Sequence, residues 1–550
     1  MFEQNRIPVV SSVESTLVPG EERPYRRLHR GPGEPHLERR DLMSQSSGGG
    51  PRADERSMAG LIHFTDFQIA DLASPSRVEF LQRLVGEKGW ERMLPAYRPQ
   101  EFMLAQAIEL IVRSMNAFAA EDPERWTLAL TTGDNTDSAQ HNELTTFLNC
   151  LEGGRIEPAA GTRGFSDAPV GLGDDHYYNP EPWSEDVWKS SLGLPTYPGA
   201  VAASVQPFDA VGLRIPWLSC FGNHDCLVQG RAARPEGYND ILTGSSKPVD
   251  RPADAPSGDK LSAYVEDPTW VSTGRADEIE ARDDRRMVSK REYIEQHLAA
   301  PGAPSGHGFT ADNFTTGHAY YVYDGLPGIR MIVLDTTNIA GHVDGCVDDA
   351  QFVWLEERLA EVHSRYRAVD GSTVQADGED RIVVIASHHG LSTMTNDFGG
   401  ETYDDGEEKG KRHLAADVEA LLHRFGNVAL WLSGHTHINK ITPRPGASGG
   451  FWEVSTASIA EWPVQFRSIE IFAGAEALRV RTTMVDSQVP AAPDGSLDLA
   501  DLASLHREIG ANDPGSVGGL HAQGSPADRN QDLLVPVSPE LLKSLARDPR

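Results

Sequence analysis

Five short segments of the chain carry side chains that could bind metal ions. Each follows an apolar run, and each supplies carboxylate, amide or imidazole groups. The segments are Asp66-Phe67-Gln68, Gly133-Asp134-Asn135-Thr136-Asp137, Gly222-Asn223-His224-Asp225, His388-His389 and Gly434-His435-Thr436-His437. A hydrolytic centre with two metal ions needs one carboxylate shared between the ions and further ligands for each, with the ions about 3.5–4 Å apart. Together the five segments contain such a set.

Taken singly, the motifs are weak. An Asp at a strand end is usually a turn or helix-capping residue, and a lone His is more often a satisfied polar residue than a ligand. The segment Gly434 to His437 is more informative, because two histidines two positions apart on a turn can reach adjacent metals. Asn223-His224-Asp225 is the strongest signal, because three successive polar side chains after a buried strand cost free energy unless they serve a purpose.

The elements that must position these segments follow from the apolar patterns. Buried strands are predicted at 61–65, 126–132, 215–221, 329–334, 382–387 and 428–433, and helices at 102–118, 348–365 and 414–425, the last ending at Gly426. Alternation of continuous apolar strands with helices predicts an α/β domain with buried sheets. Ligands bind beyond the strand ends in such folds, and the polar segments lie there.

With these motifs the chain resembles the calcineurin-like metallophosphoesterase superfamily. The family pattern is Asp-x-His, Gly-Asp-x-x-Asp, Gly-Asn-His-Asp or Glu, a lone His and Gly-His-x-His, and the likeness covers roughly residues 60–485 with interruptions. The resemblance implies a four-layer α-β-β-α sandwich with long loop insertions. It also implies a dinuclear hydrolase of phosphoric esters, in which a hydroxide bridging two divalent metal ions attacks phosphorus.

The resemblance also assigns roles to residues. It implies that the first metal is held by Asp66, Gln68, Asp134 and His437, and the second by Asp134, Asn223, His388 and His435. His224 would protonate the leaving group or stabilise the phosphoryl oxygens. Asp225 would orient His224, and Asp137 would contact the ligands without binding a metal itself.

Two points stay open at this stage. His388 is the ligand if the pair is aligned on the Gly-Leu-Ser that follows, and His389 then either faces substrate or forms a hydrogen bond behind the ligands. Gln68 stands where the family usually has His. A neutral amide oxygen favours Mn, Fe, Mg or Ca over Zn at the first site. We therefore expect a weaker first metal, or a Gln68 that does not ligate.

The net charge and the motifs limit the classes of substrate that we expect. The 550 residues include 50 Lys and Arg against 81 Asp and Glu, for a formal net charge of −31. An acidic surface repels nucleic acid, which disfavours a nuclease of the same superfamily. A non-catalytic binding protein that keeps the fold is a further alternative, favoured only by Gln68 and opposed by His224 beside Asp225. The expected substrate is a small phosphate ester, and the motifs do not separate phosphatase from phosphodiesterase.

Composition predicts three parts of the chain. Residues 1–58 read as a flexible arm, 59–487 as the catalytic domain with insertions at about 153–210 and 230–318, and 488–550 as a polar tail with short helices near 499–509 and 539–546. Aromatic residues between Tyr177 and Tyr197 could stack on a nucleoside or lipid-like group. Four cysteines are too few for a disulfide framework, although Cys220 and Cys226 could pair. No membrane span or leader is evident, so a cytoplasmic location is expected, and the oligomeric state stays open.

Overall fold

Two β-sheets form the centre of the structure, a computed structural model that describes residues 9–43, 55–158, 175–399, 410–447 and 449–547. The larger sheet has seven strands in the order β3 (Leu37–Arg39), β23 (Gln531–Val535), β22 (Leu478–Asp486), β21 (Gln465–Ala473), β4 (Arg56–Phe64), β5 (Trp126–Thr131) and β8 (Trp217–Ser219). The smaller has six, in the order β11 (Tyr321–Leu326), β12 (Ile329–Val333), β16 (Ile382–Ala386), β18 (Val428–Ser433), β20 (Gly449–Ser455) and β19 (Lys440–Gly446).

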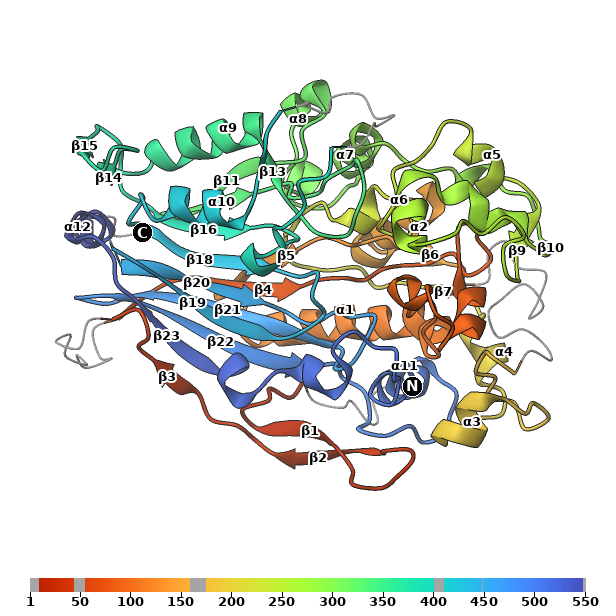
Figure 1. The fold of residues 1–550 in the computed structure, drawn as a ribbon. Coiled ribbons are helices and arrows are strands. Elements are labelled where there is room, and N and C mark those ends of the chain that lie inside the picture. Colours follow the sequence, from red (N-terminus) through yellow and green to blue (C-terminus); the bar gives the residue numbers. More distant parts are fainter. Residues whose placement is uncertain (1–8, 44–54, 159–174, 400–409, 448, 548–550) are drawn as a thin grey trace.

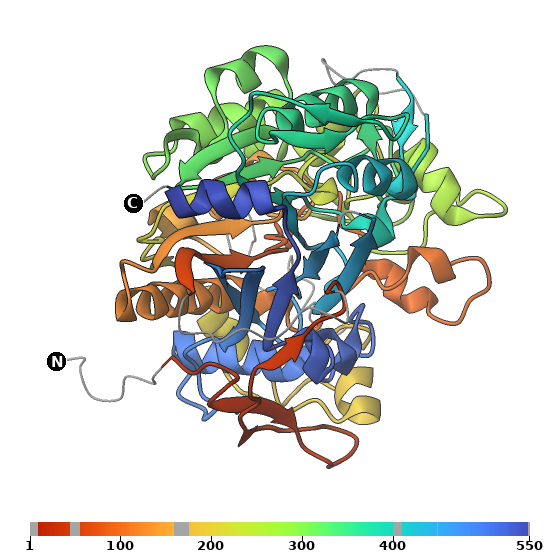
Figure 2. The ribbon, with the colours of Figure 1, turned by 90° about the vertical axis from the view of Figure 1, so that its left-hand side faces the viewer.

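Helices cover the outer face of each sheet. The pair α9 (Asp349–Ala360) and α10 (Ala415–Leu422) lies on the six-stranded sheet, and α1 (Leu104–Glu121) and α11 (Leu499–Gly510) lie together on the seven-stranded sheet (Figures 1 and 2). Residues of β16 alternate between two apolar clusters. Val383 and Ile385 pack with α9 and α10, whereas Ile382 and Val384 pack with the cluster that holds β4. The predicted four-layer α-β-β-α sandwich is confirmed.

One helix has the length and apolarity of a membrane-spanning segment, contrary to the expectation that the sequence contains no such segment. The segment Glu101–Glu121, which contains α1, has a mean hydropathy of 1.2, and 72% of its most apolar window is buried inside the fold. Apolar residues surround this helix because it packs on a sheet and on α11. Its composition is therefore that of a core helix.

Parallel strands bring the polar segments to one edge. Strands β4, β5 and β8 run parallel in one sheet, and β12, β16, β18 and β20 run parallel in the other. Their carboxyl ends therefore share an edge in each sheet. The predicted strands and helices are present with shifted ends. The helix expected to end at Gly426 stops earlier, with His423 as its C-cap.

The expectation of a flexible arm over residues 1–58 is wrong for the residues that the structure describes there, 9–43 and 55–58. Strands β1 (Ser15–Pro19) and β2 (Leu28–Pro32) form an antiparallel hairpin, and β3 joins the seven-stranded sheet beside β23. Leu17 and Leu28 are buried against Trp462. These few apolar residues are sparse in sequence but meet on one face, which gives the hairpin a core to pack on.

The segment 488–550 contains the two predicted helices, α11 and α12 (Pro539–Arg547), but it is also part of the core. Strand β23 extends the sheet beyond β22. In α11, the buried Arg507 donates to the backbone oxygen of Pro490. The segment therefore completes the sheet rather than trailing from it.

The first insertion packs its aromatic rings inside the protein. Tyr177, Tyr178 and Trp188 are buried with residues of α11, next to α3 (Val187–Leu192) and α4 (Ala200–Ser204). The Tyr197 hydroxyl donates to Asp501. Among the described residues, Tyr177, Tyr178, Trp188 and Tyr197 are therefore committed to packing, and the expected role in stacking on a substrate is wrong for them.

The second insertion lies at one end of the sheets, and its residues 238–278 are on the right in Figure 1. It contains α5 (Tyr238–Leu242), α6 (Lys260–Glu266), α7 (Lys290–Ala299) and α8 (Ala311–Thr316), and the small sheet of β9 (Ser246–Pro248) and β10 (Ala276–Glu278). Tyr238 and Tyr264 pack with Phe80 and Trp90 in an apolar cluster apart from the main core.

All four cysteines are buried, and none forms a disulfide within the described chain.

Candidate metal centre

The five polar segments converge at the carboxyl ends of strands from both sheets. Asp66 follows β4, Asp134 follows β5 and Asn223 follows β8, while His388 follows β16 and His435 follows β18. The ligand atoms of Asp66, Asp134 and His388 all lie within 4.8 Å of one another, as do those of His388, His389 and His435. The centre therefore lies where the two sheets meet, and neither sheet could form it alone.

The backbone of these segments adopts a conformation that most residues avoid. The φ angles are positive at Asp66 (55°), Gln68 (43°), Asp134 (52°), His435 (66°) and His437 (56°). Positive φ is uncommon outside glycine and collects at functional sites. Here it turns the side chains that follow the strands toward one point.

Two glycines make room for the central carboxylates. A Cβ on Gly222 would lie 2.3 Å from Asp134 Oδ1, and a Cβ on Gly434 would lie 2.5 Å from Asp66 Oδ2. Both distances are too short for any side chain. The glycines of two motifs are thus required by close approach to the carboxylates.

Asp134 lies at the middle of the cluster. Its Oδ2 is 3.1 Å from His388 Nε2, and its Oδ1 accepts a hydrogen bond of 2.9 Å from the backbone N–H of His224. Burial by itself would lower the pKa of His388, but the charges of Asp134 and Asp66 outweigh it and raise the pKa to about 9. The charge of His388 in turn holds the pKa of the Asp134 carboxyl well below its usual range, against the opposing effect of burial. Both carboxylates are therefore ionised at neutral pH.

The donor set fits divalent cations. Among the described residues, Asp66 Oδ1, Asn223 Oδ1 and His388 Nε2 are buried without a hydrogen bond, and the first and last of them lie 3.3 Å from His437 Nε2 and 3.1 Å from Asp134 Oδ2. Such atoms cost free energy unless something satisfies them. Asn223 Nδ2 donates to Gly230 O at 3.0 Å, and His388 Nδ1 bonds to Thr132 O at 2.8 Å, which leaves the orphan atoms as the ligating ones. Divalent cations held by these atoms would satisfy all three.

The neighbouring residues His388 and His389 differ in their hydrogen-bond partners. His389 Nδ1 bonds to Thr336 Oγ1 at 2.9 Å and its Nε2 bonds to Val343 O at 2.8 Å. Both ring nitrogens are thus engaged by protein, and burial lowers the pKa of His389 well below its usual value. Its ring packs 4.3 Å from that of His435. His388 is therefore the residue of the pair with a nitrogen available to a metal, and His389 supports the ligands from behind.

Gln68 has a partner that the sequence did not suggest. Its Oε1 accepts a hydrogen bond of 2.5 Å from Arg98 Nη2. An amide oxygen has a second lone pair, but a cation bound there would lie beside a guanidinium charge. The weaker first site, or a Gln68 that does not ligate, remains a prediction, and Arg98 gives it a physical cause.

Glu461 is a second residue that the sequence analysis missed. Its Oε1 lies 3.1 Å from His437 Nδ1 and accepts from Arg98 Nε at 2.9 Å, while its Oε2 accepts from Ser516 Oγ at 2.8 Å. His437 Nε2 lies 3.3 Å from Asp66 Oδ1. Burial alone would lower the pKa of His437, but the charges of Glu461 and Asp66 raise it to about 10. The available signal was an acidic residue inside the otherwise apolar run Ile459 to Trp462.

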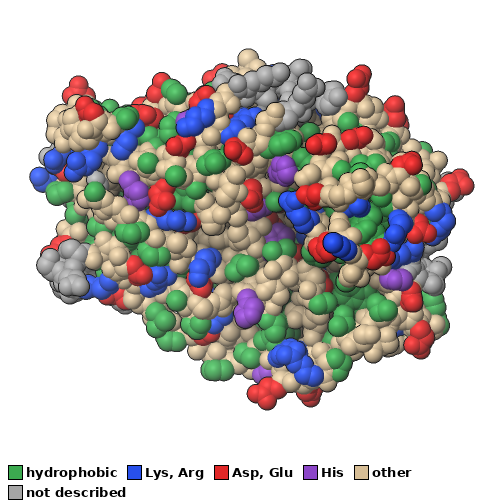
Figure 3. Space-filling model, in the orientation of Figure 1, with side chains coloured by type: hydrophobic (Ala, Val, Ile, Leu, Met, Phe, Trp, Pro, Cys, Tyr) green, Lys and Arg blue, Asp and Glu red, His purple; other side chains and the backbone are tan. Residues whose placement is uncertain are grey.

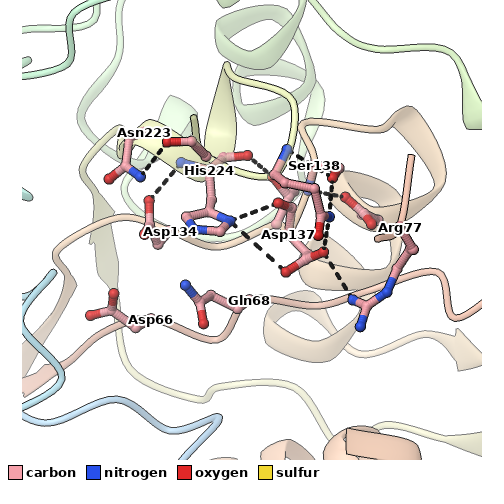
Figure 4. A network of polar contacts seen from close by, with 12 residues as sticks. Asp66, Gln68, Arg77, Asp134, Asp137, Ser138, Asn223 and His224 are labelled. Atoms are coloured by element: carbon pink, nitrogen blue, oxygen red, sulfur yellow. Dashed lines mark hydrogen bonds and ion pairs between the residues drawn. The ribbon is translucent and has the colours of Figure 1, made fainter. Parts of the chain in front are cut away.

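His224 is oriented by Asp137 rather than by Asp225, so that part of the expectation is wrong. His224 Nδ1 bonds to the backbone oxygen of Asp137 at 2.7 Å and lies 3.9 Å from its carboxylate (Figure 4). Asp225 instead accepts from the backbone N–H groups of Asn135, Thr136 and Gly222. Asp225 therefore links the loop of residues 133–137 to that of residues 222–225, because its carboxylate points at backbone N–H groups and not at the His224 ring.

A cavity of about 460 Å³ opens beside the centre. Its walls include Gln68, Asp134, Asn223, His224, His435 and His437 from the converging segments, and Arg77, Arg98, Arg231 and Tyr264 from elsewhere. Arg77 forms ion pairs with Glu101 and, at 2.9 Å, with Asp137. The cavity thus joins the candidate ligands to the second insertion.

No protein-family model and no curated protein matches the chain. Solved structures to which this chain has some similarity include a dimetal phosphatase from Danio rerio, at 11% identity and a TM-score of 0.35, covering 79% of this chain and 98% of that one. They also include the sulfate thiohydrolase SoxB of Thermus thermophilus, at 14% identity and a TM-score of 0.25, covering 79% of this chain and 57% of that one. A 5'-nucleotidase from Candida albicans matches at 10% identity and a TM-score of 0.27, covering 83% of this chain and 59% of that one. Likenesses this low carry no argument about this chain. The chemistry of the centre follows from its own residues, whose His and Asp groups could hold metal ions.

Proposed function

We propose that this chain is a metal-dependent phosphoesterase, a phosphatase or phosphodiesterase that hydrolyses a small phosphate ester in the cavity beside the centre. The observation that carries the proposal is the convergence of six candidate ligands: four belong to the two groups whose ligand atoms lie within 4.8 Å of one another, and Asn223 and His437 line the cavity beside them. These ligands are Asp66, Asp134, Asn223, His388, His435 and His437. A partly exposed imidazole, His224, lies next to them in the cavity wall.

The ligands divide between two positions. Asp66 and His437, with Asp134, would hold one ion, and Asn223, His388 and His435, again with Asp134, would hold the other. When bound, two divalent cations supply positive charge to the phosphoryl oxygens and lower the pKa of a water molecule. At the position nearest Gln68 we favour Mn, Fe or Mg over Zn, because the nearby neutral group is an amide oxygen.

His224 is the proposed proton donor. A carbonyl oxygen only accepts, so the bond to Asp137 O fixes a proton on Nδ1 and leaves Nε2 for the substrate. An imidazolium can then pass its Nε2 proton to the leaving oxygen and end as the neutral tautomer that Asp137 already holds. Arg77 and Gln229 bind the Asp137 carboxylate, at 2.9 and 2.6 Å, and keep this loop in place.

A small substrate fits the charge of the chain better than nucleic acid does. The formal net charge is −31. On the face shown in Figure 3, Lys and Arg side chains are scattered among acidic ones rather than gathered in a stripe. Nucleic acids are bound by contiguous basic surface. The nuclease alternative predicts cleavage of single-stranded DNA with strong dependence on salt. A cytoplasmic location and the lack of a membrane contact remain predictions.

The test combines elemental analysis of the purified protein with two chromogenic substrates, p-nitrophenyl phosphate and bis-p-nitrophenyl phosphate, in the presence of Mn²⁺. We expect bound metal and turnover of at least one ester. Asp134→Asn should lose both, whereas His224→Ala should lose turnover and keep its metal. A protein that binds metal but turns over neither ester would favour the non-catalytic alternative and refute the proposal.

A further inference from the structure

One arginine in the cavity wall has no carboxylate partner. Arg98 forms ion pairs with Glu461 and Glu101, and Arg77 pairs with Glu101 and Asp137. Arg231 instead donates one hydrogen bond of 3.1 Å to the backbone oxygen of Met93, and no described carboxylate lies within 4.0 Å of it. Its side chain is partly buried, and burial lowers the pKa of Arg231. A desolvated charge without a counter-ion is costly unless a ligand supplies one.

A buried donor without a hydrogen bond also lines this cavity. The side chain of Tyr264, in α6, is fully buried, and its hydroxyl has no hydrogen-bond partner among the described residues. Burial raises the pKa of Tyr264, so the hydroxyl stays protonated and can donate. The Tyr264 ring packs edge-on against Trp270, with centroids 6.5 Å apart, which fixes its direction.

Both donors belong to the second insertion, and both adjoin the metal centre. Gly230, next to Arg231, lies against the His224 ring so closely that a Cβ there would be 2.3 Å from His224 Cδ2. The oxygen of the same glycine accepts from Asn223. Arg231 and Tyr264 therefore lie along the wall that continues from the candidate ligands, in the one cavity that holds them all.

We propose that Arg231 and Tyr264 bind a second anionic group of the substrate, a phosphoryl or carboxylate group, while the metal centre holds the phosphoryl group that is cleaved. The inference rests on the proposed function. A guanidinium offers parallel N–H groups that match the oxygens of such an anion, and the tyrosine hydroxyl adds a third donor. Binding supplies the counter-ion that Arg231 lacks and the acceptor that Tyr264 lacks. The second insertion thus selects doubly anionic esters.

The test uses three esters with the same three-carbon chain, which differ only at the far end. They are 3-hydroxypropyl phosphate, 3-phosphooxypropanoate and 1,3-propanediol bisphosphate. The wild type should prefer an ester with an anionic end, and comparison of the carboxylate with the phosphoryl ester identifies the group that fits. Arg231→Gln should raise KM for the preferred ester by at least about tenfold, the loss expected for a charged hydrogen-bonded pair. It should change KM for the hydroxyl ester less than about twofold.

Two further variants sharpen the result. Tyr264→Phe should raise the same KM by roughly threefold to tenfold, since one neutral donor is lost. Arg234→Gln removes a neighbouring arginine that donates to Met287 O and lies outside the cavity wall, and it should behave as wild type. If Arg231→Gln does not fold, Arg231→Lys and Tyr264→Phe carry the test, because both keep the volume of the side chain. An equal loss on all three esters would overturn the inference, since Arg231 would then support the centre as a whole.

Binding without turnover distinguishes failure of the inference from failure of the proposed function. Calorimetry of the metal-loaded protein should show pyrophosphate binding more tightly than inorganic phosphate, with the difference removed in Arg231→Gln. That result with no turnover of any ester would refute the proposed function and leave the anion site standing. Equal affinities for the two anions in the wild type, together with turnover of simple esters, would overturn the anion site alone.

Discussion

Glu461 offers the sharpest test of the centre, because it contacts a candidate ligand that the motifs identify and is itself outside every motif. Its carboxylate is 2% exposed and receives Arg98 Nε at 2.9 Å, Ser516 Oγ at 2.8 Å and the N–H of Val517 at 3.2 Å, besides lying 3.1 Å from His437 Nδ1. Glu461→Gln keeps the shape and removes the charge. His437 and Arg98 would then both face a neutral amide.

We expect Glu461→Gln to lower both the stability of the protein and its affinity for metal. Breaking a buried ion pair by removing one partner costs about 3–5 kcal/mol of stability. Loss of the partner that orients a ligating histidine lowers metal affinity about 10–100-fold, which is about 1.4–2.8 kcal/mol. The first is measured by urea unfolding of the metal-free protein, and the second by calorimetric titration of that protein with Mn²⁺.

The control is Asp532→Asn. Asp532 is 1% exposed and binds Arg479 Nη1 at 2.9 Å and Arg481 Nε at 2.8 Å, in strand β23 and away from the converging segments. This variant should lose comparable stability and bind Mn²⁺ as the wild type does. If Glu461→Gln bound Mn²⁺ with unchanged affinity and stoichiometry, His437 would not be a ligand and the division of the centre into two positions would fail.

Three further predictions concern histidines. His224→Asn should lower kcat by about 10²–10⁴-fold, the usual contribution of a general acid, with metal content unchanged by elemental analysis; normal turnover would remove His224 from the mechanism. In the metal-free protein the pKa of His388 is about 9 and that of His437 about 10, so both must lose a proton to ligate, and calorimetry should show metal affinity rising as pH increases from 7 toward 9. A flat or falling affinity would contradict this. His363 is buried, its Nε2 accepts from Asn427 N at 3.0 Å, and burial lowers its pKa from 6.5 to about 4. Its contribution, about 3 kcal/mol, should be fully present above pH 6.5 and lost as pH falls toward 4, so His363→Gln should flatten the pH dependence of urea unfolding in that window; an unchanged slope would argue against it.

The ligand segments were predictable because their signals are local. An apolar strand followed by Asp, Asn or His is visible within one stretch of sequence, as at Asp66, Asp134 and Asn223. Parallel strands then bring such ends to one edge whatever the loop lengths between them. The α/β class and the placing of these segments beyond strand ends therefore followed from the sequence patterns, whereas the four-layer sandwich was implied by the family resemblance.

The supporting contacts were not predictable because they join distant segments. Arg98 reaches Gln68 and Glu461, and Glu461 reaches His437, although no motif contains Arg98 or Glu461. The orientation of His224 by the Asp137 carbonyl depends on a backbone atom, which carries no sequence signal at all. The low apolar content of residues 9–43 led to the prediction of a flexible arm. That Leu17 and Leu28 share one buried face depends on tertiary packing, which the sequence pattern does not show.

The parallel pairing of β3 with β23 has a consequence for how the protein is made. Ser12 Oγ donates to Asn530 Oδ1 at 2.9 Å across 518 positions of sequence, and β3 pairs with β23 beside it. During synthesis, residues 531–535 must leave the ribosome before β22 gains its outer neighbour. Until then β22 presents an unpaired edge, the feature through which nascent chains associate with one another. We expect the yield of native protein to fall when translation is slow relative to this association, and chaperones that shield strand edges to restore it.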